Sequence, residues 1–263
     1  RGFLEAADPN DRVHPTINPL GTLTGRMSCS NPNLQNLTRD AKEIRGCFVA
    51  EPGHVLLSVD YSAVEWRVAA AVTNDANMKR VFAEGGDIHA DVARIVFGPD
   101  FTKAQRQQCK SVGLGRLYGG GVDALARQSG LPRHKVEEAV AAIDSLYPGI
   151  KETVQRDYET IDGPTPVELL SGRRVIVDSA HKALNVRCQG FACDLLKYAI
   201  LRLFDKGYGQ YILLPVHDEL IFSVPKDEAQ EMLAEIQEIM RCEVNGVSIE
   251  ADGEILGERW RKA

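Results

Sequence analysis

A short apolar run at residues 54–61 gives the clearest strand pattern in the chain. It runs His-Val-Leu-Leu-Ser-Val-Asp-Tyr and ends next to an acid, which predicts a buried strand. Residues 211–224 hold two more apolar β-prone runs around His217-Asp218-Glu219, which predicts a hairpin that presents carboxylates at its turn. Residues 165–177 predict two strands around a Ser-Gly turn, and residues 247–256 predict a final strand.

Helical periodicity fills most of the remaining chain. Residues 62–72 are helical in pattern, and Gly-Pro or Leu-Pro breaks separate further predicted helices at about 87–97, 103–118, 121–129, 132–146 and 148–161. A long helix is predicted over roughly 179–206, and an acidic amphipathic helix over 226–243. Residues 1–50, rich in Pro, Asn, Thr and Ser, predict mostly extended or irregular chain. Strands at both ends around an all-helical block predict an α+β domain with a helical insertion.

Composition narrows the class of protein without identifying it. The 263 residues are 44% hydrophobic and 26% charged, which is typical of a globular protein and excludes disordered and fibrous classes. No apolar run approaches 18 residues, so no transmembrane helix is predicted. The six scattered cysteines predict reduced thiols in a cytosolic protein. An N-terminus without methionine predicts a piece of something longer.

The charge distribution is more informative than the charge total. A formal charge of -6 argues, by itself, against a nucleic-acid binder. Residues 101–118, however, hold four basic residues and no acid, for a local charge of +4. Residues 226–243 are correspondingly acidic. The net charge therefore averages over opposed regions and does not identify the partner.

Two acidic positions stand where apolar strands end. Asp60 closes the strand at 54–61, and Asp218 with Glu219 forms the predicted hairpin turn. A carboxylate at the end of a buried strand needs compensation to stay ionised, and shared Mg²⁺ ions provide it. The alternative is structural: Asp60 caps the helix that follows, and Asp218-Glu219 is a polar turn.

The helix predicted at 103–118 has a second distinctive pattern. Steps of four residues bring Arg106, Lys110, Leu114 and Tyr118 to one face. Two cations one turn apart suit a phosphate chain, and the apolar and aromatic positions suit a heterocycle and a sugar. The alternative is an ordinary amphipathic surface helix.

Together these segments resemble the motifs of family A DNA polymerases, the bacterial DNA polymerase I type. Asp60-Tyr-Ser-Ala-Val-Glu-Trp-Arg67 resembles the first polymerase motif, Arg106-x3-Lys110-x3-Leu114-Gly-x2-Tyr118-Gly the second, and Val216-His-Asp-Glu219 the third. Thr24-Gly-Arg26 through Pro32-Asn-Leu-Gln-Asn36, and Asn185-x3-Gln189-Gly190, also agree. The resemblance runs through all five segments in order, up to Gly257-Glu-Arg-Trp260.

The resemblance implies an α+β fold with an antiparallel palm sheet, packed helices and a helical fingers insertion. The palm would comprise residues 1–73 and 165–263, and the fingers residues 74–164. The thumb and exonuclease domains are expected to be absent from this chain. The missing thumb or other upstream domains of the same polymerase are therefore among its expected partners. The expected location is a bacterial cytoplasm or a phage-infected cell, and no membrane partner is expected.

The resemblance also implies a reaction and roles for individual residues in it. It implies DNA synthesis from dNTP on primer–template DNA with two Mg²⁺ ions, held by Asp60, Asp218, the Tyr61 carbonyl and Glu219. Lys110 is the candidate proton donor to pyrophosphate. Glu65 would crowd the sugar 2′ position, and Leu114 stands where Phe or Tyr is usual. The nucleotide-binding residues implied are Arg106, Lys110, Leu114, Tyr118, His89 and Glu65.

Contacts to DNA are implied by the remaining motif positions. Minor-groove acceptors common to all correct base pairs would test geometry without sequence preference. The residues implied are Arg26, Asn33, Gln35, Asn36, Asn185, Gln189, His217 and Arg173, with Arg39 and Arg174 as further backbone candidates. Two alternatives remain: a single-subunit RNA polymerase, which Glu65 opposes, and a non-catalytic polymerase-derived fragment that binds nucleic acid.

Overall fold

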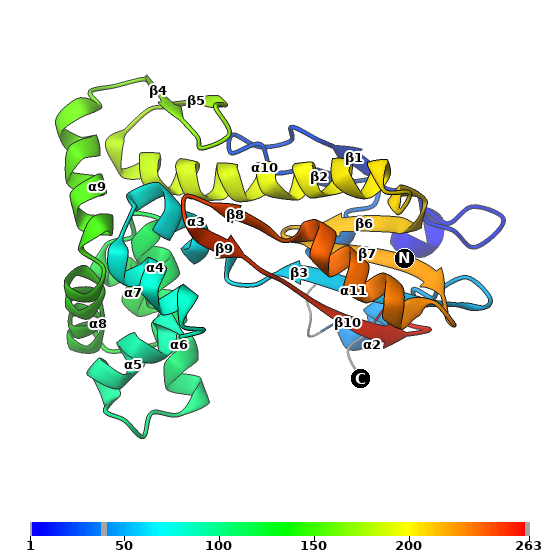
Figure 1. The fold of residues 1–263 in the computed structure, drawn as a ribbon, viewed down its shortest axis with the longest axis horizontal. Helices are drawn as coiled ribbons and strands as arrows, with labels where there is room; N and C mark the ends of the chain where they lie inside the picture. Colours follow the sequence, from blue (N-terminus) through cyan, green and yellow to red (C-terminus); the bar gives the residue numbers. More distant parts are fainter. Residues whose placement is uncertain (1, 38–40, 261–263) are drawn as a thin grey trace. The chain divides into compact units, whose positions relative to one another are not determined.

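The chain folds as two compact units. The computed structural model describes residues 2–37 and 41–260. The first unit, here called the sheet unit, comprises residues 1–64, 192–242 and 249–263, and the second, the helical unit, comprises residues 65–191 and 243–248. Helix α10 (Ala183–Asp205) begins in the helical unit and ends in the sheet unit (Figure 1). The palm and fingers boundaries expected from the resemblance stay a prediction.

The sheet unit is built on one four-stranded antiparallel sheet, in the order β10-β3-β7-β6. Strand β3 spans His54–Tyr61 as predicted, and β6 (Ile212–Val216) and β7 (Glu219–Pro225) form the predicted hairpin. Strand β10 (Ala251–Gly257) pairs with the other edge of β3. The expected α+β class with an antiparallel sheet is confirmed.

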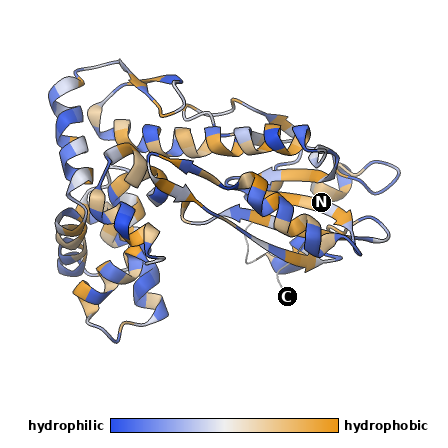
Figure 2. Ribbon diagram, viewed as in Figure 1, coloured by the Kyte–Doolittle hydropathy of each residue, from blue (hydrophilic) through white to orange (hydrophobic). Residues whose placement is uncertain are grey.

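Both faces of this sheet are buried, which explains the nearly continuous apolar pattern of β3. On one face lies α11 (Ala229–Met240): a Cβ added to Gly253 of β10 would come within 2.6 Å of Leu233. On the other face, Leu56 and Ile221 pack with Leu34 and other apolar residues from the N-terminal segment. In Figure 2, β6 and β7 are hydrophobic over most of their length.

The helical unit contains the predicted helices, with ends set by local caps. Thr102 and Gln105 form a capping box at the start of α6, and the Asp75 and Asp87 carboxylates cap α4 and α5. Gly130 ends α7 in the left-handed conformation. The helices are α3 (Val64–Thr73), α4 (Ala76–Ala83), α5 (Ile88–Phe97), α6 (Lys103–Leu117), α7 (Val122–Ser129), α8 (Arg133–Leu146) and α9 (Pro148–Thr160).

Small elements account for most differences from the sequence prediction. The predicted pair of strands at 165–177 is confirmed as β4 (Thr165–Glu168) and β5 (Arg174–Val177). The predicted final strand is two strands, β9 (Val247–Ile249) and β10, and β9 pairs with β8 (Cys242–Val244). Helix α4 and two hairpins, β8–β9 and β1–β2 (Thr16–Asn18 and Ser28–Ser30), were not predicted. The strands of these hairpins are three residues long, too short to show a period.

The remaining elements are short. They are α1 (Gly2–Glu5), α2 (Lys42–Arg45) and the 3₁₀ turns Leu34–Asn36, Ala180–Lys182 and Gly209–Tyr211. The long α10 continues through Gly190 without a break. Within the described residues, no helix is both long and apolar enough to cross a bilayer.

A buried ion pair joins α9 to α10 inside the helical unit. Arg187 Nη1 lies 2.6 Å from Asp157 Oδ2, and the Asp157 side chain is only 5% exposed. Hydrogen-bonded pairs of this kind stabilise mainly by keeping each partner from being buried with an uncompensated charge. The pair therefore fixes the first turns of α10 against α9.

We expect Asp157→Ala to lower the free energy of unfolding by about 3 kcal/mol, because Arg187 would be left largely buried without its partner. Urea unfolding followed by circular dichroism measures the change. Glu168→Ala, which removes the partner of Arg174 in an exposed pair, is the matched control and should change stability by no more than about 0.5 kcal/mol. Equal losses in the two variants would contradict this role of the Asp157–Arg187 pair.

Candidate functional site

Strand pairing brings the predicted acidic residues together at one end of the sheet. Asp60 lies directly opposite Glu219 in the β3–β7 ladder. The main-chain N–H of Tyr61 donates to the carbonyl of Asp218 at 3.3 Å. Residues that are 158 positions apart in the chain, Asp60 and Asp218, are thus held side by side by backbone hydrogen bonds. On the far side of β3, Asp252 of β10 lies opposite Asp60.

Glu219 has a partner of its own. It is 5% exposed, and its Oε1 accepts a short hydrogen bond from the Ser58 hydroxyl, two residues before Asp60 on the same face of β3. This bond satisfies a carboxylate that would otherwise be costly to bury. It also fixes the first residue of β7 relative to the end of β3.

The acidic end of the sheet borders a cavity of about 280 Å³ within the sheet unit. His217, Asp218 and Glu219 line it from the hairpin, and Gln35 and Asn36 line it from the N-terminal segment. Three predicted DNA-binding residues and two predicted metal ligands therefore meet around one space.

Local hydrogen bonds hold the N-terminal side of this cavity in place. Asn33 Oδ1 accepts from the main-chain N–H of Gln35 at 3.0 Å, which caps the short turn Leu34–Asn36. The Gln35 side chain donates to the carbonyl of Pro215 on β6 at 2.9 Å. Asn33 therefore shapes the turn, and Gln35 ties that turn to the β6–β7 hairpin.

Arg45 is a cavity residue that sequence reasoning missed. It is 9% exposed, donates twice to the carbonyl of Leu37, and lies over the Trp260 ring at 4.4 Å. Stacking and planar hydrogen bonding of this kind suit Arg better than Lys. No sequence motif singled out Arg45, and its stacking partner Trp260 stood out only as the end of the family resemblance.

The hairpin turn lies in a positive field. Burial lowers the pKa of His217, and the nearby positive charges of Arg26 and Arg45 lower it further, while Glu219 opposes them. His217 also has a left-handed backbone, with φ of 58°. Arg26 therefore influences the turn that carries Asp218, and its contact with DNA stays a prediction.

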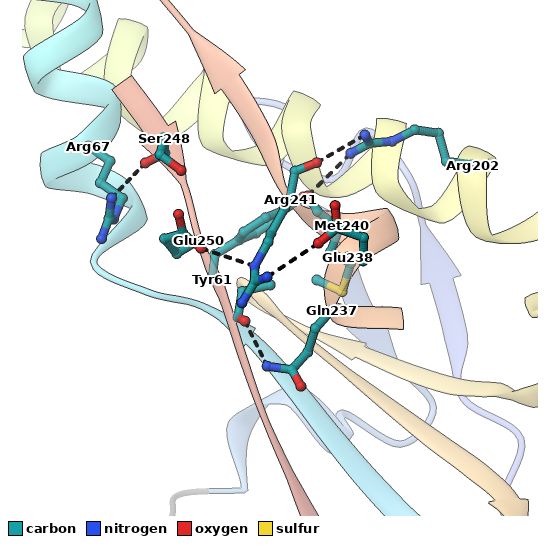
Figure 3. Close-up of polar contacts among 10 residues, drawn as sticks. Tyr61, Arg67, Arg202, Gln237, Glu238, Met240, Arg241, Ser248 and Glu250 are labelled. Atoms are coloured by element: carbon teal, nitrogen blue, oxygen red, sulfur yellow. Dashed lines mark hydrogen bonds and ion pairs between the residues drawn. The ribbon is translucent and has the colours of Figure 1, made fainter. Parts of the chain in front are cut away.

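The side chain of Tyr61 anchors the end of β3 from the opposite face. Its hydroxyl donates to the carbonyl of Met240 at 3.0 Å, at the C-terminal end of α11 (Figure 3). Arg202 donates to the same carbonyl and to that of Arg241, both at 3.2 Å. The ion pair between Arg241 and Glu250, at 3.0 Å, completes this polar group. Carbonyls at a helix end need such partners, so the same bonds satisfy α11 and fix Tyr61.

The donor set suits Mg²⁺, although the chain alone does not enclose an ion. In the described part of the chain, no three His, Cys, Asp or Glu side chains are grouped closely enough to hold a metal. Asp60 and Asp218, with the Tyr61 carbonyl, offer hard oxygen ligands. Mg²⁺ is commonly held by one or two carboxylates together with water and substrate phosphates. The residues present therefore fit this ion.

In the helical unit, α6 carries the predicted four-residue row. Arg106, Lys110, Leu114 and Tyr118 are all partly exposed, whereas Cys109, Val112, Gly113 and Leu117 on the other side are buried. Gly113 is required there, because a Cβ would approach Trp66 to 2.7 Å. The row therefore lies along one accessible face of the helix.

Asp87 holds Arg106, the first cation of this row. Its Oδ2 accepts from Arg106 Nε at 2.6 Å, while Oδ1 caps α5 through the N–H groups of His89 and Ala90. Burial opposes ionisation of Asp87, but the bonds from Arg106 and Ala90 keep its pKa below the usual value. The sequence placed Asp87 at the start of a predicted helix and gave no sign of its contact with Arg106.

His89 lies beside the same cations in a neutral state. Burial lowers its pKa to about 4, and the charges of Lys110 and Arg106 add to this, against Asp87. The ring packs edge-on against Trp66, with centroids 5.7 Å apart. His89, Arg106 and Lys110 are therefore neighbours, as the resemblance implied, and Trp66 is a supporting residue that it did not single out.

The remaining predicted residues of the helical unit lie on several separate elements. Glu65 is in the first turn of α3, and Tyr118 follows the last residue of α6. Asn185 and Gln189 are one turn apart on α10, and Asn185 Oδ1 is buried with no hydrogen-bond partner among the described residues. Arg173 donates to the carbonyl of Gly190 at 3.1 Å. Arg39 lies outside the described residues.

Comparisons with known proteins agree with these motifs. The model of "DNA polymerase family A" matches residues 2–262. The chain is 36% identical over 262 residues to a DNA polymerase of Mycobacterium phage D29, covering 98% of this chain and 43% of that protein. It is also 36% identical over 275 residues to the thermostable DNA polymerase I of Thermus filiformis, covering 96% of this chain and 33% of that enzyme.

A solved structure shows the same fold. The POL domain of Pol1 from M. smegmatis, in complex with DNA primer-template and dNTP, superposes with a TM-score of 0.86 at 29% identity, covering all of this chain and 50% of that one. The chain thus spans half or less of each of these relatives. On the match to its family model over nearly the whole length, the chain belongs to DNA polymerase family A.

Proposed function

We propose that this chain carries the polymerising centre of a template-directed DNA polymerase. The reaction is Mg²⁺-dependent transfer of a nucleotide from dNTP to a primer 3′-hydroxyl, with release of pyrophosphate. The observation that carries the proposal is the pairing of β3 with the β6–β7 hairpin, which holds Asp60 beside Asp218. Residues 1–73 and 165–263 act as palm and residues 74–164 as fingers in this proposal.

Asp60, Asp218 and the Tyr61 carbonyl would hold the metal ions. The chemistry that two bound Mg²⁺ ions supply is activation of the primer hydroxyl and neutralisation of charge on the leaving pyrophosphate. Tyr61 is fixed from behind by Met240, and Glu219 by Ser58, so the ligands are pre-positioned. Gln35, Asn36 and His217 around the cavity would contact the primer end.

The accessible face of α6 would bind the incoming nucleotide. Arg106 and Lys110 would bind the triphosphate, and Lys110 would donate a proton to pyrophosphate. His89, neutral at pH 7, would act as a hydrogen-bond donor and not as a cation. Leu114 and Tyr118 would pack near the sugar and bases. The relative bound to primer-template and dNTP supports these partners.

Glu65 favours a DNA polymerase over the single-subunit RNA polymerase alternative, because a carboxylate beside the sugar excludes a 2′-hydroxyl. The presence of Asp60, Asp218, Arg106 and Lys110 together argues against a non-catalytic fragment, which has no need to keep all four.

We expect Asp60→Ala and Asp218→Ala each to reduce Mg²⁺-dependent primer extension by about 1,000-fold or more, since each removes several kcal/mol of metal-mediated stabilisation of the transition state. Single-turnover extension of a labelled primer measures the loss. Asp252→Ala, opposite Asp60 on β10 but outside the predicted ligand set, is the control and should retain activity. Retained synthesis in either main variant would refute the metal assignment.

We expect Glu65→Ala to raise incorporation of rNTP relative to dNTP by about 10- to 100-fold, because the side chain that crowds the 2′ position is removed. Ratios of kcat/KM for the matched nucleotides on one template measure the effect. Glu43→Ala, an exposed acid of α2, serves as control. An unchanged ratio would mean that another residue selects the sugar.

The low pKa of His89 predicts a pH-dependent stability difference. Unfolded histidine binds a proton below about pH 6.5 but folded His89 does so only near pH 4, so wild-type stability falls as pH decreases through this window. Between pH 7 and pH 5, His89→Gln should lose about 2 kcal/mol less stability than wild type. Urea unfolding at both pH values tests this, with exposed His134→Gln as control. Parallel losses in all three proteins would contradict it.

A further inference from the structure

One loop of the sheet unit is anchored through a single carbonyl oxygen, that of Gly25. The ammonium group of Lys197 donates to this oxygen at 2.8 Å, and the Cys193 thiol donates to it at 2.9 Å. Both donors come from α10, where they are four residues apart and so lie on one face. The carbonyl that they share immediately precedes Arg26.

Hydrogen bonds within the loop close it on itself. The N–H of Gly25 donates to the carbonyl of Thr22 at 2.9 Å, and the Thr22 hydroxyl donates to the carbonyl of Arg26 at 3.4 Å. Leu23 at the tip of the loop is 60% exposed. Gly25 is a fixed point of the loop, because it is buried and has φ of 85°, a conformation that favours glycine.

The anchor matters because of where Arg26 lies. Arg26 directly follows Gly25, and Cys29, three residues further along, packs in one apolar cluster with Val216, the residue before the hairpin turn. A loop that is fixed at Gly25 beside the turn would keep the Arg26 guanidinium at a constant distance from the cavity lined by Gln35 and His217. A minor-groove contact depends on such placement, since the acceptor sits at a fixed depth in the groove.

We propose that Lys197, assisted by Cys193, is a positioning residue that fixes the Gly25 carbonyl and so aims Arg26 at the primer–template. A lysine on a DNA-binding protein would ordinarily be assigned to phosphate, but the ammonium of Lys197 is directed to a main-chain oxygen. Its contribution to DNA binding is therefore indirect. The inference rests on the proposed function, because it assumes that Arg26 contacts DNA.

The anchor can be tested without DNA by limited trypsin digestion of the folded chain. In Lys197→Met, which keeps the aliphatic stem, cleavage after Arg26 should become about five- to tenfold faster, as expected for loss of a charge-assisted hydrogen bond. Cys193→Ala should show a smaller increase. Lys206→Met, an exposed lysine just beyond α10, is the matched control. Mass spectrometry follows the product that ends at Arg26, and an unchanged rate in Lys197→Met overturns the proposal.

A double-mutant cycle then tests the link to DNA. Primer–template affinity is measured by fluorescence anisotropy at low salt for wild type, Lys197→Met, Arg26→Ala and the double variant. We expect each single variant to bind about five- to tenfold more weakly, and the double variant to bind no more weakly than Arg26→Ala, because Lys197 acts through Arg26. Lys197→Arg, which keeps a cationic donor, should recover part of the affinity.

The outcomes distinguish a failure of the positioning role of Lys197 from a failure of the proposed DNA contact of Arg26. Additive losses, or full affinity in Lys197→Met when Arg26→Ala binds weakly, overturn the positioning role and leave the polymerase function intact. Full affinity in Arg26→Ala overturns the DNA contact of Arg26 itself, and with it the positioning proposal.

Discussion

The antiparallel pairing of β3 with β7 is the constraint on which the rest of the sheet unit depends. Side chains alternate between the two faces of a strand, so a slip of one residue would move Asp60 away from Glu219 and turn Ser58 to the wrong face. The slip is prevented from both sides. Helix α11 covers one face and the N-terminal segment covers the other, so a shift in register would expose apolar residues on each.

Internal ion pairs explain why local charge counts overstate the cations available to phosphate. Arg116 of α6 is paired with Asp144, and Arg187 of α10 is paired with Asp157. Arg106 is paired too, but half-exposed, with a carboxylate whose other oxygen caps α5. The acids of α11 lie outside its buried face, which is formed by Met232, Leu233, Ile236 and other apolar residues, so they lower the net charge without entering the site.

Local pattern predicted most elements and little of their assembly. Strand β3 matches its predicted bounds because a run buried on both faces is almost uninterrupted, and the helices between residues 87 and 161 match because proline and glycine mark their ends. Helix α4 was not predicted, and the three-residue strands of the hairpin β8–β9 were too short to show a period. The contact between Gln35 and Pro215 joins positions 180 residues apart, which no local period encodes. Motif resemblance supplied the candidate site residues, while Arg45, Asp87 and Lys197 became visible only through their contacts.

Main-chain bonds bring the two aspartates together at the end of the sheet. Asp60 is held within a ladder, and Asp218 accepts the N–H of Tyr61 through its main-chain oxygen. The side-chain bonds that stiffen this end, from Ser58 to Glu219 and from Tyr61 to Met240, belong to their neighbours. The strand pairing in this frame is made by backbone groups, which a change of side chain leaves in place. Replacing either aspartate should therefore remove a proposed ligand and keep the β3–β7 ladder, which lets a loss of activity be separated from unfolding.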